Sequence, residues 1–374
     1  MEVLNVLGAG DAFLSGLLAS LLQGKDWAES TKVANACGAI VVSRHACSAA
    51  MPTPAELAHW FGGNRNPHVD ADQQLAHLHR VTAARPGWED LCVMAFDHRS
   101  QFYDIARTAG ADESRIPALK KLLVRAAEHV ERSRQLQGHT GVLIDGGDYG
   151  RDALASATGR GWWVGRPVEL PGSRPLRFDG TRSVGSALVH WPTEQVVKCL
   201  VHYHPDDAYA LRLEQEQKVL ELWEATRESG NELLLEIIPP KSMTPEGTAD
   251  AAVLRSVKRF YNLGVKPEWW KLAPMQEQGW RALEALIAER DRHCRGAVIL
   301  GLNQPLDFLA RSFSQATNPV VKGFMVGRTL WADASLRWLK GESSDEQFVQ
   351  EVAHNFATLV DAWRNRHRAQ RAAA

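Results

Sequence analysis

From Trp88 onward the chain alternates short apolar runs with long amphipathic stretches. Most of the eight apolar runs are continuous rather than alternating, which is typical of parallel strands covered on both faces. The runs cover residues 91–96, 141–144, 162–165, 196–203, 232–238, 269–273, 297–302 and 320–326. Helical periodicity lies between them, for example over 116–135, 206–229, 249–263 and 276–292, and 348–366 would be the last helix. Eight strand–helix units over residues 88–374 predict a (β/α)₈ TIM barrel of the α/β class.

An open, doubly wound sheet is the alternative to a barrel. Such a sheet would carry a Gly-rich phosphate-binding turn after its first strand. Here the first apolar run continues into Asp97, His98 and Arg99, which offer no such turn. The pattern therefore favours the barrel.

The residues before the barrel form two zones. Residues 1–61 are apolar and rich in Gly and Ala, and we expect them to form a short, mostly helical segment. Residues 62–87 are polar, contain three His and three Arg, and are bounded by Gly and Pro. We predict that this second zone is a linker with one short helix near residues 73–81.

The composition of the 374-residue chain is that of an ordinary globular protein, with 45% hydrophobic and 23% charged residues. A net charge of −1 provides no basic field for nucleic acid, and no stretch reaches the ~18 apolar residues of a membrane helix. The five cysteines lack CxxC spacing, so we expect a reducing compartment and neither disulfides nor a zinc site. Met1 is followed by Glu2, with no signal peptide. We therefore expect a cytoplasmic protein without nucleic-acid or membrane partners, and its oligomeric state, including a homo-oligomer, stays open.

A Gly-Ala-Gly-Asp turn lies near the start of the chain. Gly8, Ala9 and Gly10 precede Asp11, and an apolar helix is expected over residues 12–22. Backbone N–H groups at such a helix start favour an anion. An Asp in this place can accept the proton of an attacking hydroxyl during phosphoryl transfer.

The stretches GAGDAF, GLLASLLQGKD and VANACGAIVVSRHACSAAMPTPAEL resemble the C-terminal end of the PfkB (ribokinase-like) carbohydrate kinases. The resemblance implies a general base at Asp11, stabilisation of the transferred phosphate by residues 8–10, and an adenine-side position for Asn35. It covers residues 1–61 and leaves out the family's sugar-binding part and most of its sheet. We therefore expect no kinase activity from this chain, and ATP and Mg²⁺ would be cofactors only of a complete kinase. The segment is either a helical appendage or the point at which this sequence begins inside a longer fusion protein.

Polar residues interrupt or follow the apolar runs, where barrel enzymes place their catalytic groups. They are Asp97, His98, Arg99, Asp145, Arg166, Glu169, Lys198, His202, Tyr203, His204, Glu236, Lys271, Asn303, Gln304, Lys322 and Arg328. Lysines inside strands stand out, because a buried ammonium is costly without a partner. His202 and His204 have no evident third ligand, so we expect no metal.

Lys198, Glu236 and Lys271 come from three successive runs. If all three point inward, they form one cluster. Burial and a neighbouring cation favour a neutral amine, which can attack a ketone and form an iminium. The carboxylate would then shuttle protons, and the second cation would tune both groups. The alternative is that each lysine reaches the rim or pairs with a carboxylate without a catalytic role.

A phosphate site is expected after the last two runs, where barrels commonly bind phosphate. Gly301 ends the seventh run, and Gly327 with Arg328 ends the eighth. Arg328 would bind phosphate with two hydrogen bonds. The alternative is that Arg328 caps the last helix.

The motifs AFDHR, VVKCLVHYHPDDA, LLLEIIPP, WWKLAP and VGRTLW are similar to those of the tagatose-bisphosphate-type class I aldolases. The resemblance implies that Lys271 forms the Schiff base, Glu236 is the acid and base, and Lys198 is an auxiliary cation. It also implies that Gly327 and Arg328 hold phosphate. Lys198 is the alternative nucleophile.

The chain also resembles the barrel domain that is fused behind 5-dehydro-2-deoxygluconokinases of myo-inositol catabolism. This resemblance implies cleavage of a phosphorylated sugar acid, 5-dehydro-2-deoxygluconate 6-phosphate, to dihydroxyacetone phosphate and malonate semialdehyde. Asp97 or Asp145 would orient hydroxyls in that reaction. Arg99 or Arg166 would hold the carboxylate, and the barrel would need no metal or other cofactor. The alternatives are that the chain is part of the kinase, or that the barrel binds a sugar phosphate without catalysis.

Overall fold

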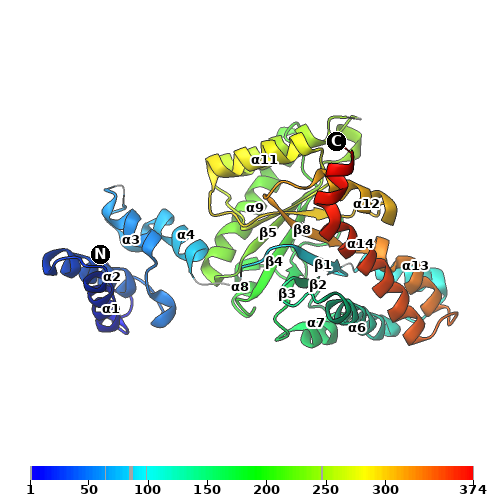
Figure 1. Cartoon of the computed structure of the whole chain (residues 1–374), viewed down its shortest axis with the longest axis horizontal. Coiled ribbons are helices and arrows are strands. Elements are labelled where there is room, and N and C mark those ends of the chain that lie inside the picture. Colours follow the sequence, from blue (N-terminus) through cyan, green and yellow to red (C-terminus); the bar gives the residue numbers. More distant parts are fainter. Residues whose placement is uncertain (1, 64, 84–86, 98, 246, 374) are drawn as a thin grey trace. The chain divides into compact units, whose positions relative to one another are not determined.

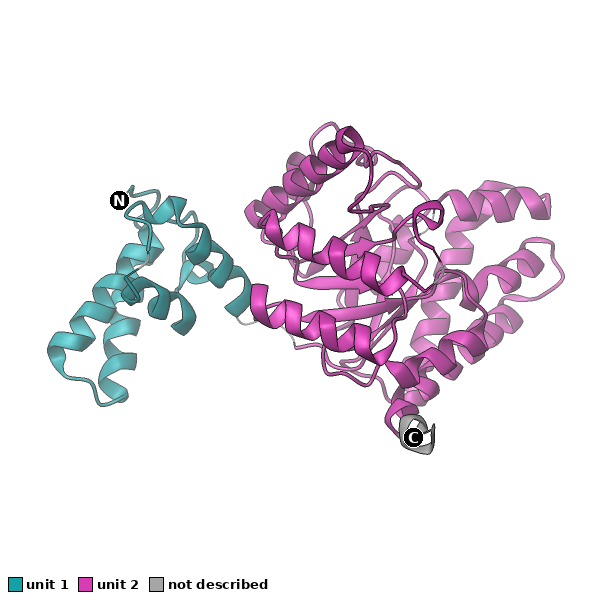
Figure 2. Cartoon of the chain, turned by 90° about the horizontal axis from the view of Figure 1, so that it is seen from above, with its two compact units in different colours: residues 1–86 teal, residues 87–374 magenta. Residues whose placement is uncertain are grey.

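The computed structural model describes residues 2–63, 65–83, 87–97, 99–245 and 247–373, with side chains described up to residue 367. The chain divides into two compact units, Met1–Pro86 and Gly87–Ala374 (Figure 2). His98, one of the polar residues noted after the first apolar run, lies outside the described residues.

The first unit is helical (Figure 1). Its elements are α1 (Ala9–Leu22), α2 (Trp27–Val42), η1 (Ser48–Ala50), α3 (Pro54–Phe61), η2 (Val69–Ala71) and α4 (Gln73–Thr82). Short polar side chains begin three of the helices, because they accept the otherwise unpaired N–H groups of the first turn. Asp26 caps α2, Thr53 forms a capping box with Glu56 in α3, and Asp72 caps α4. The expected helical character of this segment is therefore present.

The segment predicted to be a linker contains α4, near the place where one short helix was expected. Polar contacts join this helix and the loop before it to α3. Glu56 of α3 pairs with His79 of α4 at 3.0 Å, and His59 of α3 lies 3.0 Å from Asp72. The compact unit consequently extends to Pro86.

The second unit is a closed barrel of eight parallel strands in chain order, which confirms the predicted (β/α)₈ fold. The strands are β1 (Leu91–Ala95), β2 (Thr140–Leu143), β3 (Trp163–Pro167), β4 (Gln195–Val201), β5 (Leu233–Ile237), β6 (Trp269–Leu272), β7 (Gly296–Leu300) and β8 (Val321–Val326). Every one of these strands is buried over most of its length, as the continuous apolar runs indicated. The barrel closes where β8 pairs with β1.

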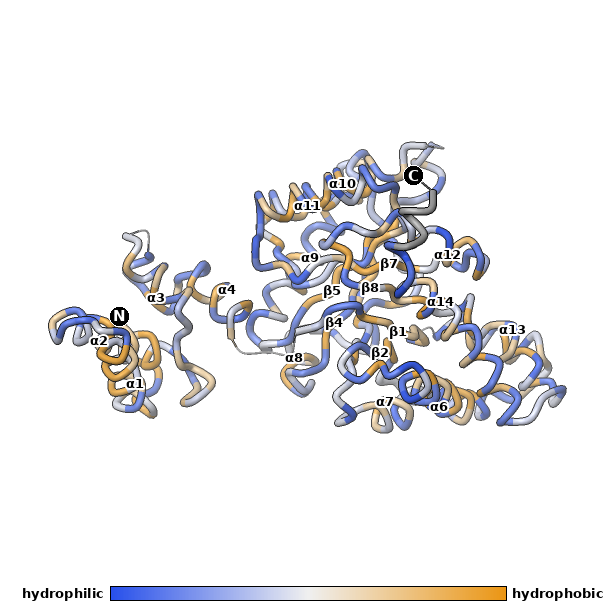
Figure 3. Tube along the Cα trace, viewed as in Figure 1, coloured by the Kyte–Doolittle hydropathy of each residue, from blue (hydrophilic) through white to orange (hydrophobic). Residues whose placement is uncertain are grey.

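Helices cover the outside of the barrel (Figure 1). They are α5 (Ser100–Ala109), α6 (Ile116–Arg134), α7 (Arg151–Ala157), α8 (Val184–Leu188), α9 (Tyr209–Ser229), α10 (Ala249–Asn262), α11 (Glu277–Arg290), α12 (Leu306–Ser312), α13 (Arg328–Leu339) and α14 (Asp345–Ala373), with short turns η3 (Glu113–Arg115), η4 (Lys241–Met243) and η5 (Phe313–Gln315). The larger core lies between strands and helices. Hydrophilic and hydrophobic segments alternate along these helices (Figure 3). Over the described residues, none of the helices combines the length and apolar character needed to cross a bilayer.

A second apolar cluster fills the inside of the barrel. Its buried members are Leu91, Val93, Ala95, Leu143, Trp163, Val196, Leu234, Trp269, Val298 and Met325. Trp163 and Trp269 meet edge to face, with ring centroids 6.4 Å apart and an interplanar angle of 83°. This apolar layer closes the barrel below its C-terminal mouth.

Candidate active site

The alternation of side chains along a strand decides which residues reach the mouth of the barrel. Successive side chains point to opposite faces, so a residue two positions after an interior residue also points inward. Val196, Leu234 and Trp269 belong to the interior cluster. Lys198, Glu236 and Lys271 follow them by two positions and therefore lie one layer higher.

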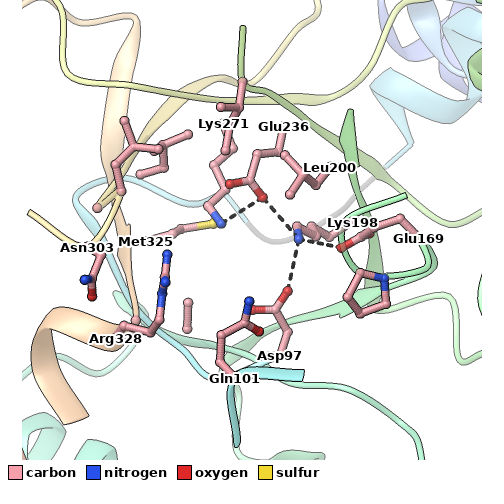
Figure 4. A pocket seen from close by; sticks show the side chains of 18 of the residues that line it. Asp97, Gln101, Glu169, Lys198, Leu200, Glu236, Lys271, Asn303, Met325 and Arg328 are labelled. Carbon is pink, nitrogen blue, oxygen red and sulfur yellow. Dashed lines mark hydrogen bonds and ion pairs between the residues drawn. The ribbon is translucent and has the colours of Figure 1, made fainter. Parts of the chain in front are cut away.

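The structure brings these three predicted residues together in a cavity of about 230 Å³ at the mouth (Figure 4). Glu236 and Lys271 are direct partners in the register between β5 and β6. The residues at positions 198, 236 and 271 are 4%, 5% and 5% exposed. The cluster is therefore enclosed.

Lys198 is the centre of the charge network. Its Nζ lies 2.8 Å from Glu169 Oε1, 3.0 Å from Asp97 Oδ2 and 3.1 Å from Glu236 Oε2. Burial opposes the charge of the Lys198 amine, but the three carboxylates outweigh burial and raise its pKa well above the ordinary value. Lys198 is consequently a fixed cation, which argues against it as the nucleophile.

Lys271 has a different environment. Its Nζ donates a hydrogen bond to Glu236 Oε2 over 3.0 Å. Among the described residues, Glu236 is the only carboxylate in ion-pair contact with Lys271. Of the two amines, Lys271 is therefore the less compensated by negative charge, and its neighbour Lys198 adds a positive field.

Glu236 lies between the two amines, because the same oxygen contacts both (Figure 4). Burial opposes the charge of Glu236, but Lys198 and Lys271 outweigh burial and lower the pKa of the carboxyl. Glu236 is therefore an ionised carboxylate that can exchange protons with the Lys271 amine.

Two further polar residues of the cavity received no role from the sequence. Glu169 was noted only as a polar residue after the third run, and Gln101 of α5 was not noted. Burial is the main cause that raises the pKa of Glu169. The negative charge of Asp97 raises this pKa further, whereas the positive charge of Lys198 lowers it. The position of Glu169 just beyond a strand end is a sequence signal for a residue of the barrel mouth. Its contact with a lysine of the next strand could not be read from spacing.

The opposite side of the cavity contains the residues predicted to bind a phosphate. Gly301, Leu302, Asn303, Gly327 and Arg328 line it. Leu302 and Asn303 have positive φ values of 48° and 58°, so this loop turns sharply after β7. Helix α13 starts at Arg328, and its N-terminal N–H groups favour an anion. Among the described residues, the Arg328 guanidinium has no hydrogen-bond or ion-pair partner, so this cation is available to a ligand.

Replacing Arg328 with alanine should therefore weaken binding of a phosphorylated substrate. A charge-assisted contact contributes roughly 1.5–3 kcal/mol, which predicts a KM about 10- to 100-fold higher with a smaller change in kcat. Arg281 of α11 is 70% exposed at its side chain and pairs with Glu277, so Arg281→Ala is the matched control. Steady-state kinetics on both variants test this prediction, and an unchanged KM for Arg328→Ala would contradict phosphate binding at this side of the cavity.

The remaining predicted ligands are held by contacts with other parts of the barrel. The carboxylate of Asp145 pairs with Lys120 of α6, and both are buried. Arg99 lines the cavity, but its Nη1 donates to Asp179 at 2.8 Å and its Nη2 to the Glu169 carbonyl at 2.7 Å. The guanidinium of Arg166 stacks on Trp191 at 3.7 Å and does not line the cavity.

Some of the other polar residues at the strand ends line the cavity at the barrel mouth, and the others lie outside it. His202 lines the cavity, and burial lowers the pKa of its imidazole. Tyr203 donates to Glu216 of α9 at 2.6 Å, and His204 accepts from the Asp206 N–H. Lys322 of β8 pairs with Glu89 at 2.9 Å, outside the cavity. No group of three or more His, Cys, Asp or Glu in the described part of the chain is placed to hold a metal.

The kinase-like turn of the first unit has a surface position. Gly8 adopts φ 84° before α1, and a Cβ there would lie 2.8 Å from Cys47 Sγ, so glycine is required. Asp11 and Asn35 are exposed. The described cavity of this unit, between α1, α2 and α3, is lined by neither of them nor by residues 8–10. The predicted kinase residues therefore form no enclosed site here.

Comparison with known proteins relates the start of the chain to a kinase family. Residues 1–54 match the pfkB family of carbohydrate kinases. The 5-dehydro-2-deoxygluconokinases of Bacillus thuringiensis (strain Al Hakam), Bacillus cereus (strain 03BB102) and Bacillus anthracis (strain A0248) are each 40% identical to it over 57 residues. The matched stretch covers 15% of this chain and 17% of each relative, so the chain spans about a sixth of the length of these kinases.

The barrel is similar in fold to a solved aldolase. The ternary co-crystal structure of fructose-bisphosphate aldolase from Plasmodium falciparum, in complex with TRAP and a small-molecule inhibitor, matches with a TM-score of 0.54. The match covers 77% of this chain and 93% of that chain at 10% identity, which shows a shared fold.

A family profile spans most of the chain. Residues 56–367 match the family described as "Uncharacterized protein conserved in bacteria (DUF2090)". The match begins within α3 and ends within α14, so it includes α4 and the whole barrel. The chain belongs to the DUF2090 family.

Proposed function

We propose that the barrel is a class I aldolase that cleaves a phosphorylated keto sugar acid through a Schiff base on Lys271. One observation carries the proposal: two enclosed amines share the carboxylate of Glu236, and only Lys198 is surrounded by further carboxylates. Lys271, which has one carboxylate contact, is therefore the amine that we assign to attack the ketone. The aldolase-like fold agrees with this chemistry without specifying it.

The proposed substrate is 5-dehydro-2-deoxygluconate 6-phosphate, an intermediate of myo-inositol catabolism. The first residues are similar to enzymes named 5-dehydro-2-deoxygluconokinase, whose phosphorylated product would be this compound. Arg328 and the start of α13 would bind the phosphate. Asp97 would orient a hydroxyl beside Lys198, and Arg99 is the cavity-lining cation that we propose for the carboxylate.

The proposed reaction proceeds in four steps. The Lys271 nitrogen adds to the ketone carbon, and the carbinolamine loses its hydroxyl as water to leave an iminium. The hydroxyl at C3 then loses its proton, the C3–C4 bond breaks, and its electrons pass to the iminium to give an enamine. Malonate semialdehyde leaves as the aldehyde. Protonation of the enamine and hydrolysis release dihydroxyacetone phosphate and restore Lys271, and no metal or other cofactor enters the balance.

A coupled assay tests this proposal. The purified chain is incubated with 5-dehydro-2-deoxygluconate 6-phosphate, and dihydroxyacetone phosphate is detected by NADH oxidation with glycerol-3-phosphate dehydrogenase. Release of dihydroxyacetone phosphate supports the aldolase. Tight binding without turnover would instead indicate a non-catalytic sugar-phosphate-binding barrel. ATP-dependent phosphorylation of the unphosphorylated sugar acid, without cleavage, would favour the kinase alternative.

A further inference from the structure

Besides Glu236 and Asp97, the mouth contains a third buried carboxylate next to Lys198. Glu169 follows β3 and is 4% exposed, and it lines the same cavity as Glu236. Lys198 lies between the two carboxylates, 2.8 Å from Glu169 and 3.1 Å from Glu236 (Figure 4). The carboxylates of Glu169 and Glu236 therefore both contact the ammonium of Lys198.

The oxygens of Glu169 are unequally satisfied. Oε1 accepts from Lys198, whereas Oε2 is buried and has no hydrogen-bond partner among the described residues. Arg99 Nη2 lies 3.8 Å from Oε1, but it donates to the Glu169 carbonyl, and Nη1 donates to Asp179. A buried carboxylate with one bare oxygen is costly, so this site favours a bound proton.

The charged groups that face Glu169 are Lys198 from β4 and, from the segment after β1, Asp97 and Arg99. Burial is the first cause that raises the pKa of Glu169, and the Asp97 charge raises it further. Lys198 and Arg99 act in the opposite direction without cancelling the rise. Glu236 has the reverse balance, because two amines lower its pKa.

We propose that Glu169 is the general base that accepts the proton of the hydroxyl at the carbon–carbon bond that breaks, whereas Glu236 serves the amine of Lys271. A base is most effective when its pKa lies near the working pH, and Glu169 is the stronger base of the two carboxylates. The proposal deepens the proposed aldolase function and rests on it.

The step balances as follows. The hydroxyl proton passes to a Glu169 oxygen, and the former O–H electrons form the aldehyde C=O. The electrons of the broken C–C bond pass to the iminium on Lys271. Glu169 then holds one proton, which leaves to water before the next turnover.

The first test is chemical trapping with borohydride during turnover of 5-dehydro-2-deoxygluconate 6-phosphate. The wild-type protein should give the three-carbon adduct of the cleaved substrate on Lys271, by peptide mass. Glu169→Gln should accumulate the uncleaved six-carbon adduct, because the iminium still forms. We expect its kcat to fall by roughly 10²- to 10⁴-fold. Formation of the six-carbon adduct also shows that the variant has folded.

The second test separates a base from a residue that merely positions Lys198. Wild-type cleavage should rise with pH as Glu169 loses its proton, above the usual carboxyl range. Glu169→Gln should lose this rise in its residual activity, and Asp179→Asn should retain it. Asp179 is 39% exposed at its side chain, and Arg99 is its ion-pair partner among the described residues. An unchanged pH limb, or a three-carbon adduct at the wild-type rate in Glu169→Gln, would overturn the assignment. Absence of any Lys271 adduct in the wild-type protein would instead overturn the aldolase proposal itself.

Discussion

Replacing Lys271 with methionine is expected to abolish cleavage. The value of kcat/KM should fall by roughly four to six orders of magnitude, because the covalent intermediate cannot form and its partner groups cannot substitute for the missing amine. Methionine retains the length and apolar stem of lysine, so the barrel should still fold. Release of dihydroxyacetone phosphate from 5-dehydro-2-deoxygluconate 6-phosphate measures the effect.

The chain provides a matched control for this variant. Lys322 also lies within a strand, on β8, but it pairs with Glu89 outside the cavity. Lys322→Met should therefore keep the wild-type rate. Cleavage by Lys271→Met at a rate close to that of Lys322→Met would rule out Lys271 as the nucleophile.

Replacing Lys198 with methionine is expected to cost both stability and activity. The substitution leaves Asp97, Glu169 and Glu236 buried without their shared ammonium. Removal of one partner from a buried ion pair costs about 3–5 kcal/mol, and here three carboxylates lose it. Urea unfolding should show a decrease of at least this size, whereas Lys322→Met, whose partner Glu89 is 70% exposed at its side chain, should change stability by about 0–1 kcal/mol.

The loss of stability in Lys198→Met should depend on pH in a defined direction. Without the ammonium, Glu169 loses the contact that most lowers its pKa while burial still raises it, so the folded state binds more protons above the usual carboxyl range. The free energy of unfolding then falls as pH rises through that window. The difference between variant and wild type should therefore be larger at pH 8 than at pH 5. A difference that is constant or larger at pH 5 would contradict the proposed charge network.

Most of the barrel could be predicted because its strands are continuous apolar runs. Each of the eight runs overlaps one strand, and helices such as α6 and α10 lie within one residue of the ranges expected from periodicity. Errors lie at the ends of elements. The fourth run was extended to Tyr203, but β4 ends at Val201, because Tyr203 turns outward to bond with Glu216.

The lysine–glutamate cluster could be predicted because its residues lie inside three successive apolar runs. Contacts made between a strand and a distant loop or helix leave no such signal. Asp145 illustrates this, because its partner Lys120 comes from α6, 25 residues earlier. Glu169 illustrates it too, because Lys198 reaches it from the next strand. The sequence also suggested a neutral environment for strand lysines, whereas three carboxylates keep Lys198 charged.

The central claim is tested most directly by finding which lysine carries the trapped substrate. Borohydride reduction during turnover of 5-dehydro-2-deoxygluconate 6-phosphate, followed by peptide mapping, identifies the amine that forms the Schiff base. The charge network predicts a reduced adduct on Lys271, with Lys198 unmodified. An adduct on Lys198, or cleavage with no adduct on any lysine, would contradict it.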